Sequence, residues 1–247
     1  MRRWLLAFIA LALALPAFAQ PRFPAKPVTI VVPYPPGGSN DTFARELGKR
    51  LSDVWKVPVI VENKPGAGGS IGAAAVSRAA PDGYTLCLLS SSFTTNAAIQ
   101  TNLPFDPVAG FTPVGMVSKG PMILTVAPKV PARTTLELFD YARRNPGKLN
   151  FASSGQGSTN HFATELLMDA AQIRMTHVPY KGMGPAVTDT IAGHVDVLIA
   201  SAPSIYQQVK AGKVRALGVT SPGPSVVVPD MPALASMGVP GLSLIHI

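Results

Sequence analysis

Short apolar segments alternate along the chain with longer segments whose apolar residues recur every three to four positions. Residues 28–32 form a β-branched, apolar run of the kind found in buried strands. Four apolar residues then recur at every fourth position, as on one face of a helix: Phe43, Leu47, Leu51 and Trp55. The same pattern predicts further strands or extended segments at 58–62, 84–89, 112–117, 122–126, 149–152, 176–178, 195–200 and 215–220.

Helices are predicted between most of these strands. Thr134 and Glu137 have the spacing of a capping box, which predicts a helix from there to residue 144. Pro185 suits the first turn of a later helix. Strands that alternate with helices in this way predict an α/β fold, with parallel sheets covered by helices on both faces.

The first nineteen residues have the pattern of a targeting segment. Arg2 and Arg3 precede an apolar run over 4–15, which is too short to span a hydrocarbon core of about 30 Å. Ala17 and Ala19 then fit a small-x-small cleavage site. We therefore expect a Sec-type signal peptide cleaved after Ala19, with an uncleaved anchor as the alternative.

Composition excludes several classes of protein. The chain has 247 residues, of which 47% are hydrophobic and 14% charged, which is too apolar for a disordered tail and enough for one large or two small domains. The single cysteine, Cys87, excludes an intramolecular disulfide framework and lies in an apolar run, where a buried, inert thiol is expected.

The positive charge is dispersed. The formal net charge is +8, and removing Arg2 and Arg3 leaves 19 basic and 13 acidic residues, a net charge of +6. Nucleic-acid binding calls for basic residues clustered beside aromatics, which this sequence lacks. A small anionic molecule is the better expectation for a ligand.

Two glycine-rich loops share one design. The two loops are residues 32–41 (VPYPPGGSND) and 151–161 (FASSGQGSTNH). Each runs from the end of a predicted strand to the start of a predicted helix, where it carries hydroxyl and amide side chains. Glycine lets the backbone approach a ligand, and helix N-termini attract anions. In open α/β sheets, ligands lie at the carboxyl ends of the strands. The pair predicts a cleft that holds both ends of a dianion, although these polar residues also suit simple helix caps.

A catalytic alternative stays open at this point. Residues 68–72 (GGSIG) match the nucleophile elbow, which places its serine directly after a strand. Here residues 63–67 intervene, which favours Ser70 as a helix cap over a serine hydrolase partnered by His161, His177 or His194. No dinucleotide fingerprint, phosphate loop or metal-ligand spacing is complete, so we expect no cofactor and no metal.

Longer motifs resemble a known family. The stretches that carry the resemblance are 31–45 (VVPYPPGGSNDTFAR), 61–72 (VENKPGAGGSIG), 80–86 (APDGYTL), 178–182 (VPYKG), 193–196 (GHVD) and 212–217 (GKVRAL). With these motifs the chain resembles the solute-binding proteins of tripartite tricarboxylate transporters, also called Bug-type receptors, and the match runs in family order from about residue 26 to 241.

The resemblance implies a type II periplasmic-binding-protein-like fold: two doubly wound α/β domains with a hinged cleft. The first domain is then expected over 20–118 and the second over 119–220, with crossings near 117–121 and 220. Residues 221–247 are expected to return to the first domain and to leave it incomplete, because the family continues for several tens of residues more. On this resemblance the C-terminus looks truncated.

The resemblance also implies a function. It indicates a monomeric periplasmic receptor, not an enzyme, that captures a small organic carboxylate (a di- or tricarboxylate, an amino acid or an aromatic acid) for the membrane subunits of a tripartite transporter. A sensory-input module for a histidine kinase is the alternative. The residues expected to bind the ligand are Tyr34, Gly37, Gly38, Asn40 and Asp41 from the first loop, Ser153, Gly155, Gly157, Ser158, Thr159 and Asn160 from the second, and Ser91 and Asp196.

Overall fold

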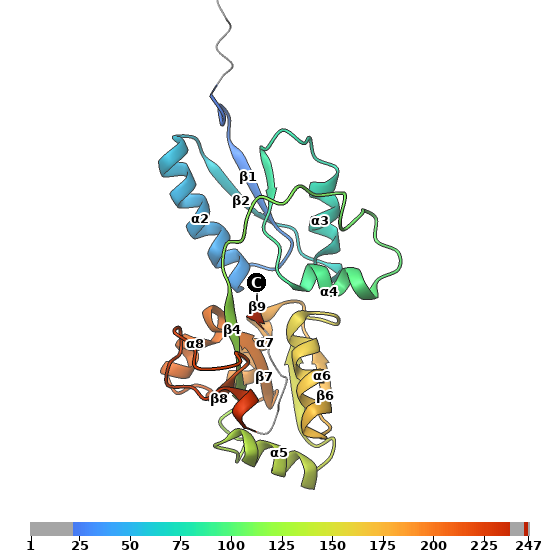
Figure 1. Ribbon diagram of the computed structural model, residues 1–247, viewed down its shortest axis with the longest axis vertical. Helices are drawn as coiled ribbons and strands as arrows, with labels where there is room; N and C mark the ends of the chain where they lie inside the picture. The colour runs from blue at the N-terminus through green and yellow to red at the C-terminus, as the bar shows by residue number, and fades with distance from the viewer. Residues whose placement is uncertain (1–21, 238–244, 247) are drawn as a thin grey trace, which may run out of the picture.

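The computed structural model describes residues 22–237 and 245–246, which form two lobes stacked along the long axis of the molecule (Figure 1). The predicted signal peptide lies outside the described residues. Among the helices that are described, none has the length and apolar character needed to cross a membrane.

The upper lobe is built on three parallel strands in the order β2-β1-β3. The strands are β1 (Val28–Val32), β2 (Val59–Asn63) and β3 (Thr85–Cys87). Its helices are α2 (Ser39–Trp55), α3 (Ser70–Ser77), preceded by the short helix η1 (Ala67–Gly69), and α4 (Ser92–Ile99). Ile30 and Val32 on β1 form a small core with Ala44 of α2, which fixes where α2 begins relative to the end of β1.

The lower lobe carries a larger sheet in the order β6-β5-β7-β4-β8, and β9 pairs with β4. Its strands are β4 (Gly120–Val126), β5 (Asn150–Ser153), β6 (Thr176–Pro179), β7 (Val197–Ser201), β8 (Arg215–Val219) and β9 (Ile245–His246). Its helices are α5 (Thr135–Arg144), α6 (Thr159–Ala171), α7 (Met183–Ala192), α8 (Ala202–Lys210) and the short helix η2 (Leu234–Ser236). Helices thus separate successive parallel strands, as the pattern predicted.

Strand β4 departs from the all-parallel expectation. It runs antiparallel to both β7 and β8. The reason is its connection, because β4 enters the sheet directly from the upper lobe instead of returning through a helix from the far end (Figure 1). Leu124 and Ile123 belong to the buried clusters on its two opposite faces, so β4 is central to the lower core.

The helix start predicted at Thr134 is confirmed. Thr134 Oγ1 accepts a hydrogen bond from the backbone N–H of Glu137 at 3.2 Å. The Glu137 carboxylate accepts one at 2.7 Å from the N–H of Arg133, the residue before the cap, instead of that of Thr134. One free N–H of the first turn is therefore capped, and the second bond of the capping box is displaced by one residue.

Two segments differ from their expected placement. Residues 221–237 pack on the lower lobe instead of returning to the upper one: Leu234 is fully buried in the lower core, and the N–H of Val219 bonds to the carbonyl of Pro232. Burial of apolar side chains beside β8 holds this segment there. Residues 112–117 form no regular strand, and the side chains of Val114 and Met116 are exposed.

Gly72 gives a test of the packing between α3 and the end of β1. A Cβ at Gly72 would meet Pro33 Cβ at 2.6 Å and the carbonyl oxygen of Lys64 at 2.7 Å. Overpacking of this kind costs about 1–3 kcal/mol, so Gly72→Ala should lower the urea midpoint. Gly115→Ala, where a Cβ meets nothing within 4 Å, is the matched control and should not lower it. Equal midpoints for the two variants would contradict the packing argument.

Candidate functional site

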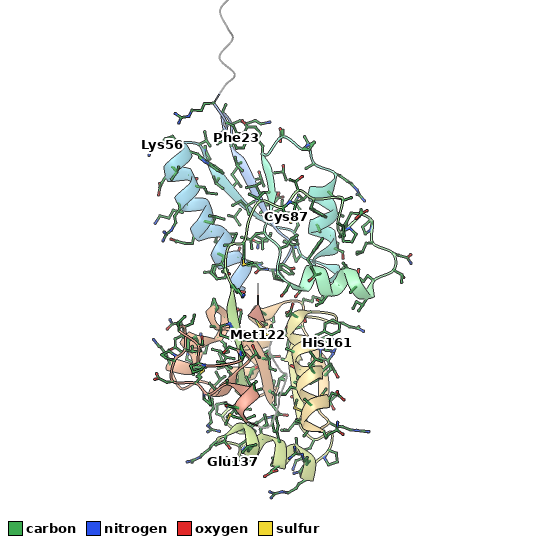
Figure 2. All side chains as sticks on the ribbon, in the orientation of Figure 1. Phe23, Lys56, Cys87, Met122, Glu137 and His161 are labelled. Atoms are coloured by element: carbon green, nitrogen blue, oxygen red, sulfur yellow. The ribbon has the colours of Figure 1, made fainter. Side chains whose placement is uncertain are left out.

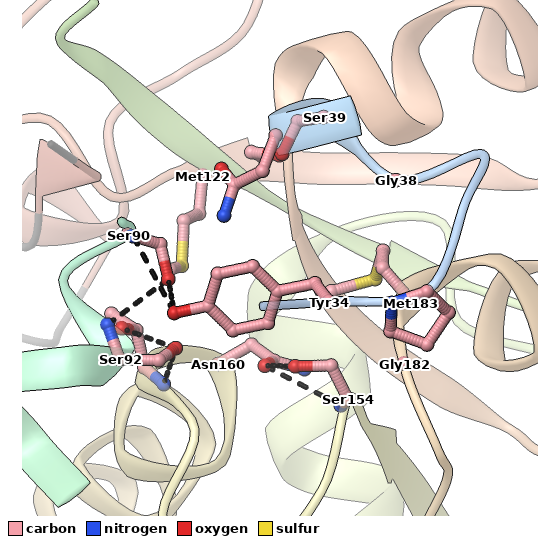
Figure 3. Close-up of a pocket in the computed structure, with 14 residues that line it drawn as sticks. Tyr34, Gly38, Ser39, Ser90, Ser92, Met122, Ser154, Asn160, Gly182 and Met183 are labelled. Atoms are coloured by element: carbon pink, nitrogen blue, oxygen red, sulfur yellow. Dashed lines mark hydrogen bonds between the residues drawn. The ribbon is translucent and has the colours of Figure 1, made fainter. Parts of the chain in front are cut away.

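A cavity of about 70 Å³ lies between the lobes (Figure 3). None of its fourteen lining residues is charged. The upper lobe contributes Tyr34, Pro35, Gly38, Ser39, Asn40, Ser90 and Ser92, and the lower lobe Met122, Ser154, Thr159, Asn160, Gly182, Met183 and Ser201. The cavity therefore offers hydroxyl, amide and backbone groups beside two methionines and an aromatic ring.

Five helices begin at this cavity. Ser39, Ser92, Thr159 and Met183 are the first residues of α2, α4, α6 and α7, and Ser201 directly precedes α8. In none of the five does the residue before the helix use its own side chain to cap the first turn. Other side chains bind two of these helix starts, since the N–H of Thr159 donates to Ser92 Oγ and that of Ser92 to Ser90 Oγ. The positive ends of the five helix dipoles still favour a negative charge at this point.

The first loop is held in shape by Asp41, whose carboxylate does not line the cavity. Its oxygens accept hydrogen bonds from the N–H of Gly37 and from Asn63 Nδ2, both at 3.0 Å, and pair with Arg45 Nη2 at 2.9 Å. Burial opposes ionisation, but these partners hold the pKa of Asp41 below its usual value. Asp41 is thus the charged anchor of the loop that presents Gly38 and Asn40.

Tyr34 crosses the cavity from the same loop. Its hydroxyl accepts a hydrogen bond from Ser90 Oγ at 2.8 Å (Figure 3). Burial raises the pKa of Tyr34 more than the bond to Ser90 lowers it. The phenol therefore stays neutral and presents its ring, not a charge, to the cavity.

The second loop is supported from below by two histidines. Ser153 Oγ lies 2.6 Å from His177 Nε2, and the N–H of Gly157 donates to His161 Nδ1 at 3.3 Å. The two imidazole rings stack with centroids 4.0 Å apart. Figure 2 shows His161 at the end of the lower lobe that faces the upper one. Ser153 and Gly157 shape the loop without lining the cavity, as do Gly155 and Ser158, whose Oγ donates to the Gly155 carbonyl.

Asn160 has an unused donor. The residue is 3% exposed, and its Oδ1 accepts a hydrogen bond from Ser154 Oγ at 2.8 Å. Among the described residues, its Nδ2 has no hydrogen-bond partner. A buried donor left unpaired costs about 1–3 kcal/mol, and here it lies at the start of α6 in the cavity wall. The site is thus arranged to donate to an acceptor.

The structure brings together five of the thirteen expected residues at the cavity wall: Tyr34, Gly38, Asn40, Thr159 and Asn160. Ser91 lies behind the wall, with its Oγ 2.9 Å from the hydroxyl of Thr159. Ser154, Ser201 and Met183, among others, line the cavity but were not predicted from the sequence. Ser201 is the last residue of β7, and Met183 begins the helix that follows β6, so the strand-to-helix rule applied to the two loops could have found them.

Asp196 is a correction to the expected site. It lies just before β7, at the opposite end of the strand from Ser201. Its carboxylate accepts a hydrogen bond from the N–H of Asn150 and pairs with Lys129, both at 2.9 Å. Its strand position and these partners give it a structural role in joining β5 to β7.

Ser70 is not placed for catalysis. It is the first residue of α3, and its Oγ donates to Gln100 Oε1 at 3.2 Å, so its described partner is an amide and not an imidazole base. Burial raises the pKa of the Cys87 thiol to about 12, which fits the expected inert cysteine.

Comparison with known proteins decides the family. The profile of the tripartite tricarboxylate transporter family receptors matches residues 43–245. The chain belongs to this receptor family. Protein BugT of Bordetella pertussis is 36% identical over 96% of this chain and 74% of its own length. The family assignment made from the motifs is therefore confirmed.

Two solved receptors share the fold closely. R. palustris Rpa4515 with adipate has a TM-score of 0.88 at 33% identity, covering 91% of this chain and 75% of that one. MatC from Rhodopseudomonas palustris with bound malate has a TM-score of 0.84 at 32% identity, covering 91% and 76%. The expected two-domain periplasmic-binding fold is confirmed, and the chain is a solute receptor, not an enzyme.

The histidine pair predicts a pH dependence of stability. Burial, together with the neighbouring His161, lowers the pKa of His177 to about 4. The unfolded chain binds this proton near pH 6.5, so the folded state should lose stability as the pH falls from about 6.5 to about 4. His177→Asn does not titrate and should show a shallower loss in urea unfolding across that range. Identical slopes for the two proteins would contradict the assignment.

Proposed function

We propose that this receptor is exported with cleavage after Ala19, binds a small carboxylate between its lobes and delivers it to the membrane subunits of a tripartite transporter. The observation that carries the proposal is Asn160 Nδ2, which has no hydrogen-bond partner among the described residues. It belongs to a cavity on which five helix N-termini converge and whose described lining residues are uncharged. A carboxylate supplies the acceptor that this donor requires.

The ligand class follows from the two sides of the cavity. A carboxylate at α6 accepts hydrogen bonds from Asn160 in the lower lobe, and a second at α2 meets Gly38 and Asn40 in the upper lobe. Met122 and Met183 supply apolar surface for the carbon chain between them. We therefore infer an aliphatic dicarboxylate, in keeping with the relatives solved with adipate and with malate.

Neutral donors are sufficient for this binding. Each hydrogen bond to a charged group contributes about 1.5–3 kcal/mol in net terms, so several together give a tight complex. The remaining expected residues act through the loops: Asp41 and Gly37 shape the first, Ser153, Gly155, Gly157 and Ser158 shape the second, and Ser91 supports Thr159.

A thermal melt of residues 20–247 against adipate, malate and their neutral diamides tests the ligand class. A ligand at a hundred times its Kd adds about 2.7 kcal/mol to the folded state. We expect at least one diacid to raise the Tm, and its diamide to leave it unchanged. A Tm that no acid raises would overturn the carboxylate proposal.

Asn160→Ala tests the site residue. Loss of one bond to a carboxylate should raise the Kd for the diacid by about 10- to 100-fold, measured by titration calorimetry. Asn102→Ala, an exposed amide outside the cavity, is the matched control and should keep the wild-type Kd. Equal affinities for both variants would place the carboxylate elsewhere.

A further inference from the structure

Helix α4 has two different faces. Ser92, Thr95 and Asn96 have the i, i+3, i+4 spacing that puts side chains on one face of a helix. Phe93 instead packs with Phe105 and Phe111, at ring-centroid distances of 5.9 and 5.4 Å. The aromatic contacts hold α4 in the upper lobe, while the polar face lies against the start of α6 (Figure 1).

This polar face bonds directly to the other lobe. Thr95 Oγ1 donates to the carbonyl of Gly157 at 2.9 Å, and Ser92 Oγ accepts from the N–H of Thr159 at 3.1 Å. Thr159 is the first residue of α6, so a side chain from the upper lobe caps a helix of the lower one. We call the bonds of Thr95 and Ser92 to the lower lobe the α4 latch.

The latch acts on the second ligand loop. Gly157 has a φ of +76°, so its position is set by a tight turn, and its N–H donates to His161. The carbonyl of Gly157 is held as well, because it accepts the hydrogen bond from Thr95 Oγ1. Asn96 also packs there, since a Cβ on Gly157 would lie 2.5 Å from its Oδ1. The loop is thus held from both lobes by protein atoms.

We propose that Thr95 is a positioning residue of the receptor, whose bond to Gly157 holds the lobes closed and orders the loop before Asn160. Thr95 does not line the cavity, so it acts through Gly157 and not on the ligand. The effect on closure stands on these contacts alone, whereas the effect on affinity rests on the proposed carboxylate function.

Three variants isolate the hydroxyl. Thr95→Val removes it at almost constant volume, and Thr95→Ser restores it. Thr94→Val is the matched control, because the Thr94 hydroxyl bonds to the Ser91 carbonyl within the upper lobe. Urea unfolding of each variant establishes that it folds, and a change confined to fold stability would affect Thr94→Val as well.

The first measurement needs no ligand. Spin labels at Arg50→Cys on α2 and Arg144→Cys on α5, in a Cys87→Ser background, report the distance between the lobes by double electron–electron resonance. We expect Thr95→Val to shift the distribution to longer distances, with Thr95→Ser and Thr94→Val matching the wild type. Equal distributions for Thr95→Val and Thr94→Val would overturn the latch.

The second measurement is the Kd for the diacid found in the melt. Loss of one interlobe hydrogen bond should raise it about fivefold in Thr95→Val and leave Thr94→Val unchanged. An unchanged Kd in Thr95→Val would overturn the positioning role. If the wild type binds no carboxylate, the proposed function fails, and the distance measurement still decides the latch.

Discussion

The cleft depends on one geometric constraint: parallel strands end at the same edge of a sheet, and each leads into a helix there. β1 leads into α2 in the upper lobe, and β5, β6 and β7 lead into α6, α7 and α8 in the lower lobe. Stacking the lobes edge to edge brings these helix starts together (Figure 1). The site therefore gathers positive helix ends, and no Arg or Lys is among the described residues that line it. β4 is antiparallel to β7 and begins at this edge, so it can serve as the connection between lobes.

Charged and titratable side chains of both lobes hold the loops and strands that shape the cleft. Asp41 fixes the turn before α2, and His177 supports Ser153 at the end of β5. Asp196 ties β5 to β7 at the far end of the sheet. Asp41, His177 and Asp196 each form hydrogen bonds within the protein. Their charges or lone pairs thus hold the neighbouring chain in place. The cavity wall is left with neutral donors, of which Asn160 Nδ2 has no hydrogen-bond partner in the part of the chain that the structure describes.

The pattern of apolar and polar residues predicted most of the strands and helices. The features that it did not predict depend on contacts between residues far apart in the sequence. The strand at Val28–Val32 and the cap at Thr134 follow from neighbours within a few residues, so both were predicted correctly. Asp196 was misplaced because a motif does not tell which end of a strand faces the cleft. Residues 221–237 bury Leu234 in the lower core, a long-range contact that no local pattern encodes. The interlobe bond from Thr95 to Gly157 was not predicted either, because it also joins residues far apart in the sequence.

A receptor must release its ligand as well as hold it, and a cleft whose described lining residues are all uncharged suits both tasks. Opening a cleft that paired the ligand with a buried Arg or Lys would have to separate opposite charges at low dielectric. Here, opening exposes hydroxyls, amides and helix starts, which water solvates readily. Affinity then depends strongly on the lobes being closed, because the donors lie on both of them. We therefore expect a contact such as that of Thr95, which joins the lobes without lining the cavity, to influence affinity through closure alone.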